Sequence, residues 1–245
     1  MKYKKIYYNY VIGNKLNELE ILNDNEREYF PDDYFEHPIP ALKNIDKSYT
    51  FSQCPAWKEY FKNTWILNQS FPLQFQYIHE DKYIVSNLSQ EQFDKFFLIN
   101  DWWQDGKHPV VEFGYSFCFW TEDRDVWVEQ FPIPEMTRSG LEIIPGSFPI
   151  SVWERPLKIA FKVLDYDKKI IIDKGAPLCY VRFSSKKTRD VKFTLEKKSI
   201  PKKVLKNQLQ HLRLKFWHKN YSWELIEKRL NKESKCPINF LRKKS

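Results

Sequence analysis

The sequence predicts a mainly β protein: an antiparallel β-sandwich or jelly-roll-like domain with short helices and a basic, helical C-terminal extension. Aromatic and apolar residues alternate most regularly between Val110 and Phe183, which is the period of a β-strand. The alternating segments are short and are separated by polar or proline-containing turns, without helical patterns between them. Such a succession favours antiparallel sheets over a parallel sheet with crossover helices.

The strands of this core are predicted from their alternation. Four aromatic residues recur at every second position from Phe113 to Phe119, and a polar loop at 121–125 leads into a strand at 126–131. Further alternating or β-branched strands are predicted at 159–163, 170–172, 178–183 and 191–195. Gly175 lies in the turn between two of them, where we expect a positive φ angle.

The residues before this core predict further elements of the same body, with an irregular, proline-containing segment among them. A first strand, a short helix and two more strands are predicted at 7–11, 55–61, 65–68 and 73–78. Ser89 and Gln92 form a capping-box pattern in front of another short helix. We expect Phe117 and Phe161 both to lie on buried faces of the sheet.

Charge divides the chain into two parts. Residues 186–245 contain 19 Lys and Arg against 5 Asp and Glu, a formal charge of +14, whereas residues 1–185 carry −6. We therefore expect a β-sandwich-like body over residues 1–196 and a basic extension over residues 197–245 that packs on it. Apolar residues recur on one helical face of this extension, at Leu205, Leu209, Leu212 and Phe216.

Composition narrows the class of protein. Aromatic residues make up 17% of the chain and include nine Trp, which is enough bulk to fill a sandwich core. The four cysteines are scattered without a C-x-x-C pair, which argues against a zinc site and favours a reducing, intracellular setting. No apolar run approaches the roughly 18 residues of a membrane span, and no apolar segment follows Met1–Lys5. The sequence therefore predicts a soluble protein without membrane contact.

Three segments carry motifs that are specific as a set: Cys54–Trp57 with Lys62–Thr64, Gly146–Pro156, and Lys174–Phe183. Through them the chain resembles, over residues 50–195, a family of uncharacterised proteins from tailed bacteriophages, including marine ones. The resemblance implies the cytoplasm of an infected bacterial host and a phage or host protein as partner. It implies no activity, and it leaves open whether the protein enters the virion.

Two groups of aromatic residues are candidates for ligand binding. Trp153 is followed by Glu154 and Arg155, and a rigid ring beside a carboxylate and a guanidinium can form the rim of a binding pocket. The alternative is a buried Glu–Arg pair beneath a packed indole. Trp102 and Trp103 lie in a polar loop, which either presents both indoles to a ligand or folds them back onto the sheet.

A metal site is the weakest of the chemical alternatives. His79 and Asp81 have the H-x-D spacing with which a strand offers two ligands to non-haem iron. A third ligand is missing, because His108 precedes the expected strands and His211 falls in a predicted helix. The competing interpretation is a polar turn between two strands. The chain contains no motif for binding a phosphate or a dinucleotide, so we predict neither a metal nor a cofactor.

The basic extension is a candidate for binding nucleic acid. Lysines that would contact phosphates are followed by an aromatic residue that would stack on bases, namely Lys197, Lys198, Lys202, Lys203, Lys206 and Trp217. The alternative is a solvated helix face held by the acidic body.

Taken together, these patterns favour a non-enzymatic binding or structural accessory protein of a bacteriophage, with a ligand that the sequence does not identify. A non-haem iron oxygenase or another enzyme on a β-barrel scaffold is one alternative. Nucleic-acid binding through the basic extension is the other. Whether the protein is an enzyme, and whether it associates with itself, stays open at this point.

Overall fold

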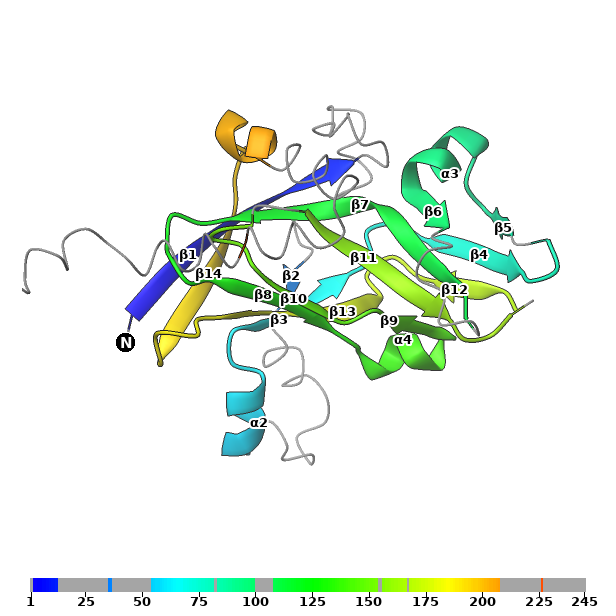
Figure 1. Cartoon of the computed structure of the whole chain (residues 1–245). Coiled ribbons are helices and arrows are strands. Elements are labelled where there is room, and N and C mark those ends of the chain that lie inside the picture. Colours follow the sequence, from blue (N-terminus) through cyan, green and yellow to red (C-terminus); the bar gives the residue numbers. More distant parts are fainter. Residues whose placement is uncertain are drawn as a thin grey trace, which may run out of the picture.

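The computed structural model describes residues 2–12, 35–36, 54–81, 83–99, 108–153, 156–166, 168–207 and 226. Strands form most of this part of the chain and are arranged in three sheets, with short helices at the periphery (Figure 1). Adjacent strands run antiparallel in all pairs but one. The mainly β class and the antiparallel pairing predicted from the sequence are confirmed.

The largest sheet, sheet A, joins the two ends of the body. Its strands are β14 (Val191–Lys197), β1 (Lys2–Ile12), β7 (Val110–Trp120), β11 (Pro156–Val163) and β9 (Leu141–Ile143), in that order, with β6 (Phe97–Ile99) also paired to β7. The exception to antiparallel pairing is here, because β1 and β14 run parallel. Parallel neighbours need a long connection, and these two strands come from distant parts of the sequence.

Two further sheets complete the body. Sheet B contains β10 (Gly146–Pro149), β8 (Trp127–Phe131), β13 (Pro177–Ser184), β3 (Thr64–Asn68) and β2 (Phe35–Glu36). Sheet C contains β12 (Ile170–Ile172), β4 (Leu73–Ile78) and β5 (Tyr83–Ser86). Sheets A and B pack against each other, and the ring centroids of Phe119 on β7 and Phe183 on β13 are 5.2 Å apart.

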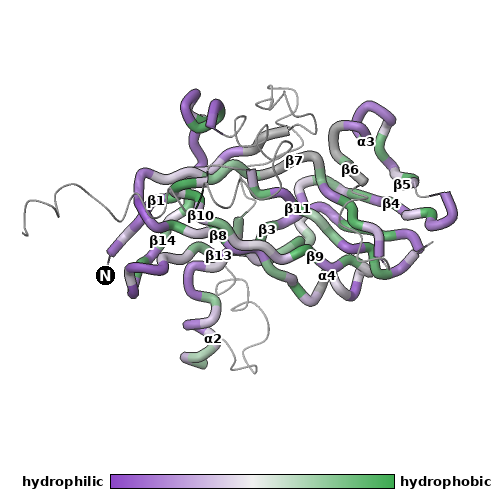
Figure 2. Tube along the Cα trace, in the orientation of Figure 1, coloured by the Kyte–Doolittle hydropathy of each residue, from purple (hydrophilic) through white to green (hydrophobic). Residues whose placement is uncertain are grey.

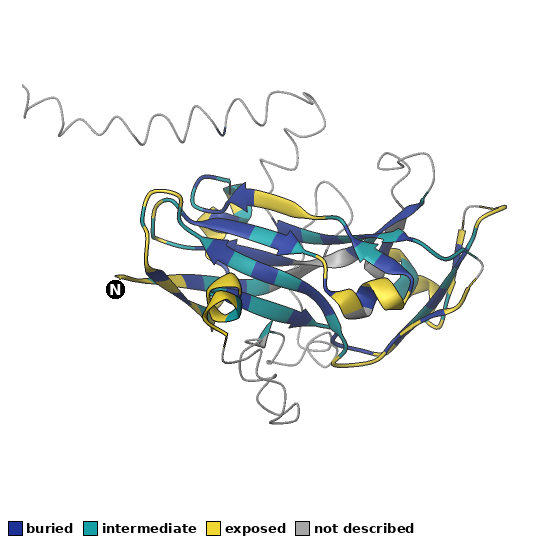
Figure 3. Ribbon diagram, turned by 90° about the horizontal axis from the view of Figure 1, so that it is seen from below, coloured by how far each residue is buried: buried dark blue, intermediate teal, exposed yellow. Residues whose placement is uncertain are grey.

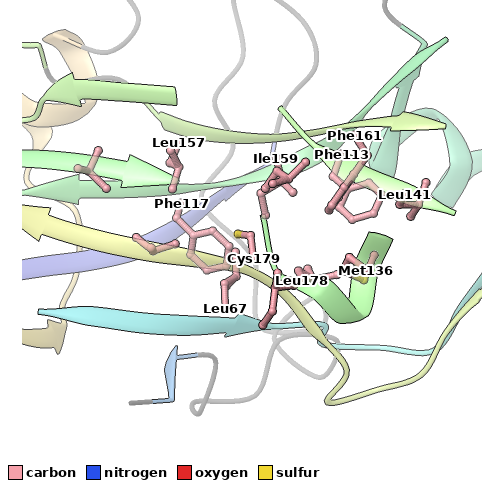
Figure 4. Packing of buried hydrophobic residues seen from close by; sticks show 14 of the residues in the cluster. Leu67, Phe113, Phe117, Met136, Leu141, Leu157, Ile159, Phe161, Leu178 and Cys179 are labelled. Carbon is pink, nitrogen blue, oxygen red and sulfur yellow. The ribbon is translucent and has the colours of Figure 1, made fainter. Parts of the chain in front are cut away.

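The core lies between these sheets, where the inward-facing residues of each strand meet (Figure 4). Phe117 and Phe161 are 0% and 1% exposed, as predicted, and Leu67 of β3 is buried with them. Alternation along β11 places every second side chain in this core, from Leu157 to Val163. The period-2 pattern of the sequence is therefore the pattern of burial.

Three short helices have local causes. α2 (Pro55–Tyr60) begins at a proline, α3 (Gln90–Phe96) follows the capping box, and α4 (Pro134–Arg138) also begins at a proline. In the capping box the Gln92 N–H donates to Ser89 Oγ, and the Ser89 N–H donates to Gln92 Oε1. The sequence predicted the first two helices and missed α4. Among the described helices, none is long and apolar enough to cross a membrane.

The outer face of sheet A is partly covered by the start of the basic extension. Cys118 and Trp120 point away from the main core but are buried, because Ile200 and Val204 pack on them. Residues 202–207 are helical, with Val204 buried and Lys202, Lys203 and Lys206 exposed. Along the strands of the body, Figure 3 shows buried residues alternating with less buried ones. Among the described residues of the extension, Ile200, Val204 and Leu205 thus contact the body. Leu209, Leu212 and Phe216, from the predicted stripe, lie outside the described residues.

Candidate nucleic-acid interface

The parallel pairing of β1 and β14 determines which side chains are neighbours on the outer face of sheet A. Its register places Tyr3 beside Lys192 and Lys5 beside Thr194. Ile6 and Tyr8 belong to the main core, so the alternate residues of β1 face outward. Tyr3 and Lys5 therefore lie on the same outer face of sheet A, next to the outward residues of β14.

The helix at residues 202–207 lies on this same face, which Figure 1 shows as the short orange helix beside β1 and β7. Its apolar side is anchored by Val204, which belongs to a buried cluster with Cys118, Trp120 and Ile200, and Tyr7 and Leu205 pack at the margin. The opposite side of the helix carries three exposed lysines, Lys202, Lys203 and Lys206. The packing thus turns the lysines of the extension toward solvent.

We call this surface the basic face. It consists of Tyr3, Lys5 and Tyr7 of β1, Lys192 and Glu196 of β14, Lys198, and Lys202, Lys203 and Lys206 of the helix. Figure 2 shows the hydrophilic residues at the start of β1 and on the helix.

Contacts between its cations and rings hold the basic face in place. The Lys198 Nζ lies 4.6 Å from the centroid of the Tyr7 ring, and the Lys192 Nζ lies 5.9 Å from that of Tyr3. Cations over aromatic faces are attracted by the ring quadrupole. Glu196 also faces outward, with its carboxylate 3.8 Å from the Lys5 Nζ.

The segments that build the basic face are strongly positive. Residues 2–9 and 186–207 together contain 12 Lys and Arg against 2 Asp and Glu. The neighbouring loop 121–125 contributes Glu122, Asp123 and Asp125, together with Arg124. This loop lowers the local charge by only two, so a large positive excess remains for an acidic ligand.

The loop that carries Lys186 and Lys187 is fixed by Asp125. The Asp125 Oδ2 accepts hydrogen bonds from the Ser185 Oγ at 2.7 Å and from the Lys187 N–H at 2.6 Å. Desolvation by burial acts to raise the pKa of Asp125, but these hydrogen bonds outweigh it and leave the pKa below its ordinary value. The Lys186 Nζ in turn lies 3.4 Å from the centroid of the Trp127 ring.

Five of the six nucleic-acid candidates from the sequence fall in described residues, and all five are exposed. Lys198, Lys202, Lys203 and Lys206 belong to the basic face. Lys197 is paired with Tyr8, whose side chain points into the core. The Lys197 side chain therefore lies on the opposite side of sheet A from the basic face. The sixth nucleic-acid candidate, Trp217, lies outside the described residues. So do four candidates for ligand binding: Trp102, Trp103, Glu154 and Arg155.

The structure describes Trp153, and its ring packs against the protein instead of projecting into solvent. Its half-buried ring meets Phe148 edge-on, with centroids 5.7 Å apart, and contacts the main core. This placement agrees with the packed-indole alternative for Trp153. Glu154 and Arg155, the other two residues of the predicted pocket rim, lie outside the described residues.

His79 and Asp81 occupy the turn between β4 and β5, where both are exposed. The His79 ring stacks on Tyr166 at 4.7 Å, and the Tyr166 hydroxyl is hydrogen-bonded to the His108 Nδ1 at 2.9 Å. The structure thus brings His79 and His108 to one tyrosine, a meeting that sequence order did not suggest. Within the part of the chain that the structure describes, no three His, Cys, Asp or Glu residues are grouped to hold a metal ion.

Sequence reasoning missed Tyr3, Lys5, Tyr7 and Lys192 as members of the interface. Part of their signal is present in the sequence, because Tyr3, Lys5 and Tyr7 share one parity of a strand, as Lys192 and Lys198 do. What hides it is the distance along the chain between the two segments.

Comparison of the chain with protein-family models and with curated proteins finds no match in either set. The interface therefore stands on the geometry and the charge of its own residues.

Proposed function

We propose that this chain is a non-enzymatic binding protein that holds nucleic acid on its basic face. The observation that carries the proposal is the meeting of β1, β14 and the helix at 202–207, which gathers the lysines of two distant segments on one side of sheet A. Before folding, these lysines belong to separate stretches of the chain. In the folded protein they form a single surface with an excess of positive charge.

Physical chemistry links such a surface to a polyanion. Lysines that contact phosphates release the counterions condensed on the nucleic acid, and this release supplies most of the affinity of sequence-independent binding. The lysines of the basic face stand on a sheet and on a helix that is itself anchored by buried residues, so their arrangement is set before binding. A preformed surface spends less free energy on ordering when its ligand arrives.

The competing interpretation is a solvated face that the acidic body neutralises. In the described residues, one carboxylate, that of Glu196, lies on the basic face itself. An exposed ion pair of this kind is worth little, since water and salt screen it. It leaves the lysines of the helix for another partner.

The test compares two variants that lose the same charge at different places. One replaces the three helix lysines (Lys202→Gln, Lys203→Gln and Lys206→Gln), and the control replaces three exposed lysines elsewhere (Lys58→Gln, Lys169→Gln and Lys174→Gln). Fluorescence anisotropy with labelled oligonucleotides at about 50 mM and about 200 mM salt measures affinity and its salt dependence.

We expect the helix variant to bind at least about tenfold more weakly than the parent, with a shallower dependence on salt, and the control to bind like the parent. Equal losses in both variants would reduce the effect to net charge and remove the role of the basic face. Undetectable binding by the parent at low salt would contradict the proposed function.

The proposal extends to a setting and to a finer topology. The motifs at Cys54–Trp57, Gly146–Pro156 and Lys174–Phe183 support an accessory role in bacteriophage infection, inside the bacterial host. The same proposal includes two finer features of the fold: the sandwich has jelly-roll connectivity, and the rest of the extension is helical. Mass spectrometry of purified particles and of infected-cell lysate distinguishes a virion component from a protein that stays in the host.

A further inference from the structure

We infer that the basic face binds single-stranded rather than double-stranded nucleic acid, with Tyr3 as the platform on which a base stacks. This inference rests on the proposed function, since it names the form of nucleic acid that the same surface takes. The observation behind it is an exposed aromatic ring among lysines.

Tyr3 is 66% exposed. This is the highest exposure of any large apolar or aromatic residue in the described part of the chain. Its ring stands on the outer face of β1, and the Lys192 Nζ approaches it at 5.9 Å. Proteins that bind single strands combine such rings, which stack on bases, with cations that follow the backbone. A tyrosine and a lysine side by side on paired strands supply both components.

Tyr7 has a different role, because its ring is already engaged. It lies 6.0 Å from the Trp120 ring and 4.6 Å from the Lys198 Nζ, and it packs at the margin of the buried cluster formed with Ile200. These contacts fix Lys198 over the sheet. Tyr7 thus positions a phosphate-binding lysine, while Tyr3 remains open to a base.

A duplex would leave Tyr3 without a ligand. In a duplex the bases stack on one another and offer no free face, so an exposed ring gains nothing beyond what the lysines provide. The helix at 202–207 is also unsuited to a groove, because it buries Val204 against the sheet and turns only lysines outward. Lysine contacts with phosphates serve both forms, whereas the stacking contact serves single strands alone.

The experiment uses the full chain and two leucine variants. Tyr3→Leu removes the ring and keeps an apolar side chain, and Tyr83→Leu is the matched control, because Tyr83 is 45% exposed on β5 of sheet C. Each protein is titrated by anisotropy against labelled oligothymidylate and oligouridylate of about 20 nucleotides, and against a DNA hairpin duplex. Circular dichroism confirms that the variants keep the parent fold.

For Tyr3→Leu we expect affinity for oligothymidylate or oligouridylate to fall about 5- to 150-fold, with affinity for the hairpin unchanged. The salt dependence should keep its slope, because the number of phosphate contacts is the same. Replacing Lys192 by Gln should instead reduce the slope by about 0.7 for a single strand. The two arms with DNA and RNA show which single strand the surface prefers.

An unchanged affinity of Tyr3→Leu for both single strands would overturn the inference, and so would an equal loss on the hairpin or a matching loss in Tyr83→Leu. In those cases the proposed function still stands if the helix-lysine variant loses binding. If the parent protein binds none of the three probes, both the inference and the proposed function fail.

Discussion

The side chain of Asn63 is bound to the backbone of Phe193, across the gap between sheet B and sheet A. The Phe193 N–H donates to the Asn63 Oδ1 at 3.1 Å, and the Asn63 Nδ2 donates to the Val191 carbonyl at 2.8 Å. Residues two apart on a strand point their backbone groups to the same edge, so the amide occupies the edge of β14 that β1 does not pair with. One side chain thus satisfies two backbone groups at this edge of the strand that carries Lys192.

Asn63 also has a φ of +56°, which asparagine tolerates better than most residues. Replacing Asn63 by Ala removes both side-chain hydrogen bonds and places an unsuited residue in this conformation. We expect the free energy of unfolding to fall by about 2–3 kcal/mol, measured by urea denaturation. Asn63→Gly separates the two causes, because glycine accepts the φ angle and lacks the amide; it should recover about 1 kcal/mol. Equal stability of the two variants would show that backbone conformation contributes nothing.

Phe117 and Phe161 test the core that the alternation predicted. Truncating either to Ala removes a fully buried ring, and we expect a loss of about 3–5 kcal/mol in the free energy of unfolding. Ile171→Ala is the control, since Ile171 is 52% exposed on β12 and should change stability by no more than about 0.5 kcal/mol. Thermal and chemical denaturation measure all three. A loss in the control as large as in the phenylalanine variants would mean that burial does not set the cost.

Gly175 has the positive φ predicted for its turn, at +83°, and an added Cβ would meet no atom within 4 Å. Gly146 offers equal space, and its φ lies outside the left-handed region. Gly175→Ala should therefore cost about 1 kcal/mol through backbone conformation alone. Gly146→Ala should stay within about 0.5 kcal/mol of the parent. If the two alanine variants melt at the same temperature, the turn has relaxed without strain.

The lowered pKa of Asp125 makes part of the stability depend on pH. A carboxyl whose pKa is lower in the folded than in the unfolded state stabilises the fold fully above its ordinary pKa of 3.8. This contribution is lost as pH falls through the folded pKa, which lies below that value. We expect the parent to exceed Asp125→Asn in stability near pH 6, and the difference to shrink as pH drops below about 4. A difference that stays constant down to about pH 2 would contradict this assignment.

The reactivity of the Cys118 thiol tests whether the start of the extension covers sheet A. In the folded protein Cys118 and Cys179 are buried and Cys54 is exposed; burial also raises the pKa of the Cys179 thiol. A chain that ends at residue 207 keeps Ile200 and Val204 and should show one thiol that reacts rapidly. A chain that ends at residue 196 loses this cover, so Cys118 should react as well. Thiol titration under native conditions counts the reactive groups, and a single reactive thiol in both chains would show that other residues protect Cys118.

Much of the fold follows from patterns confined to a few residues. Alternation in β7 and β11 predicted the burial of Phe117 and Phe161, and the Ser89–Gln92 spacing predicted the capping box of α3. These predictions succeed because burial by parity and helix capping depend on neighbours within a strand or a turn. α4 escaped prediction because it begins at Pro134, close behind β8, and a proline in that place also fits the end of a strand.

The candidate interface was predictable only in part. Its helix lysines stand out as a basic run, whereas Tyr3 and Lys192 become meaningful only as neighbours. The same holds for the contact of His79 with Tyr166, which joins two turns far apart in the chain. Local sequence leaves such pairs undetermined, because each partner keeps the same pattern whichever strand or turn it meets.

By itself the sequence determined the strand parity, the turn at Gly175, the excess of charge in the last quarter of the chain and the burial of the aromatic core. The tertiary structure decided that β14 pairs in parallel with β1, that Asn63 binds the other edge of β14, and that Val204 is buried in one cluster with Trp120. The physical reason is that strand parity is a property of one segment. Choice of partner depends on the free energy of the whole packed body, in which pairing, register and burial are settled together.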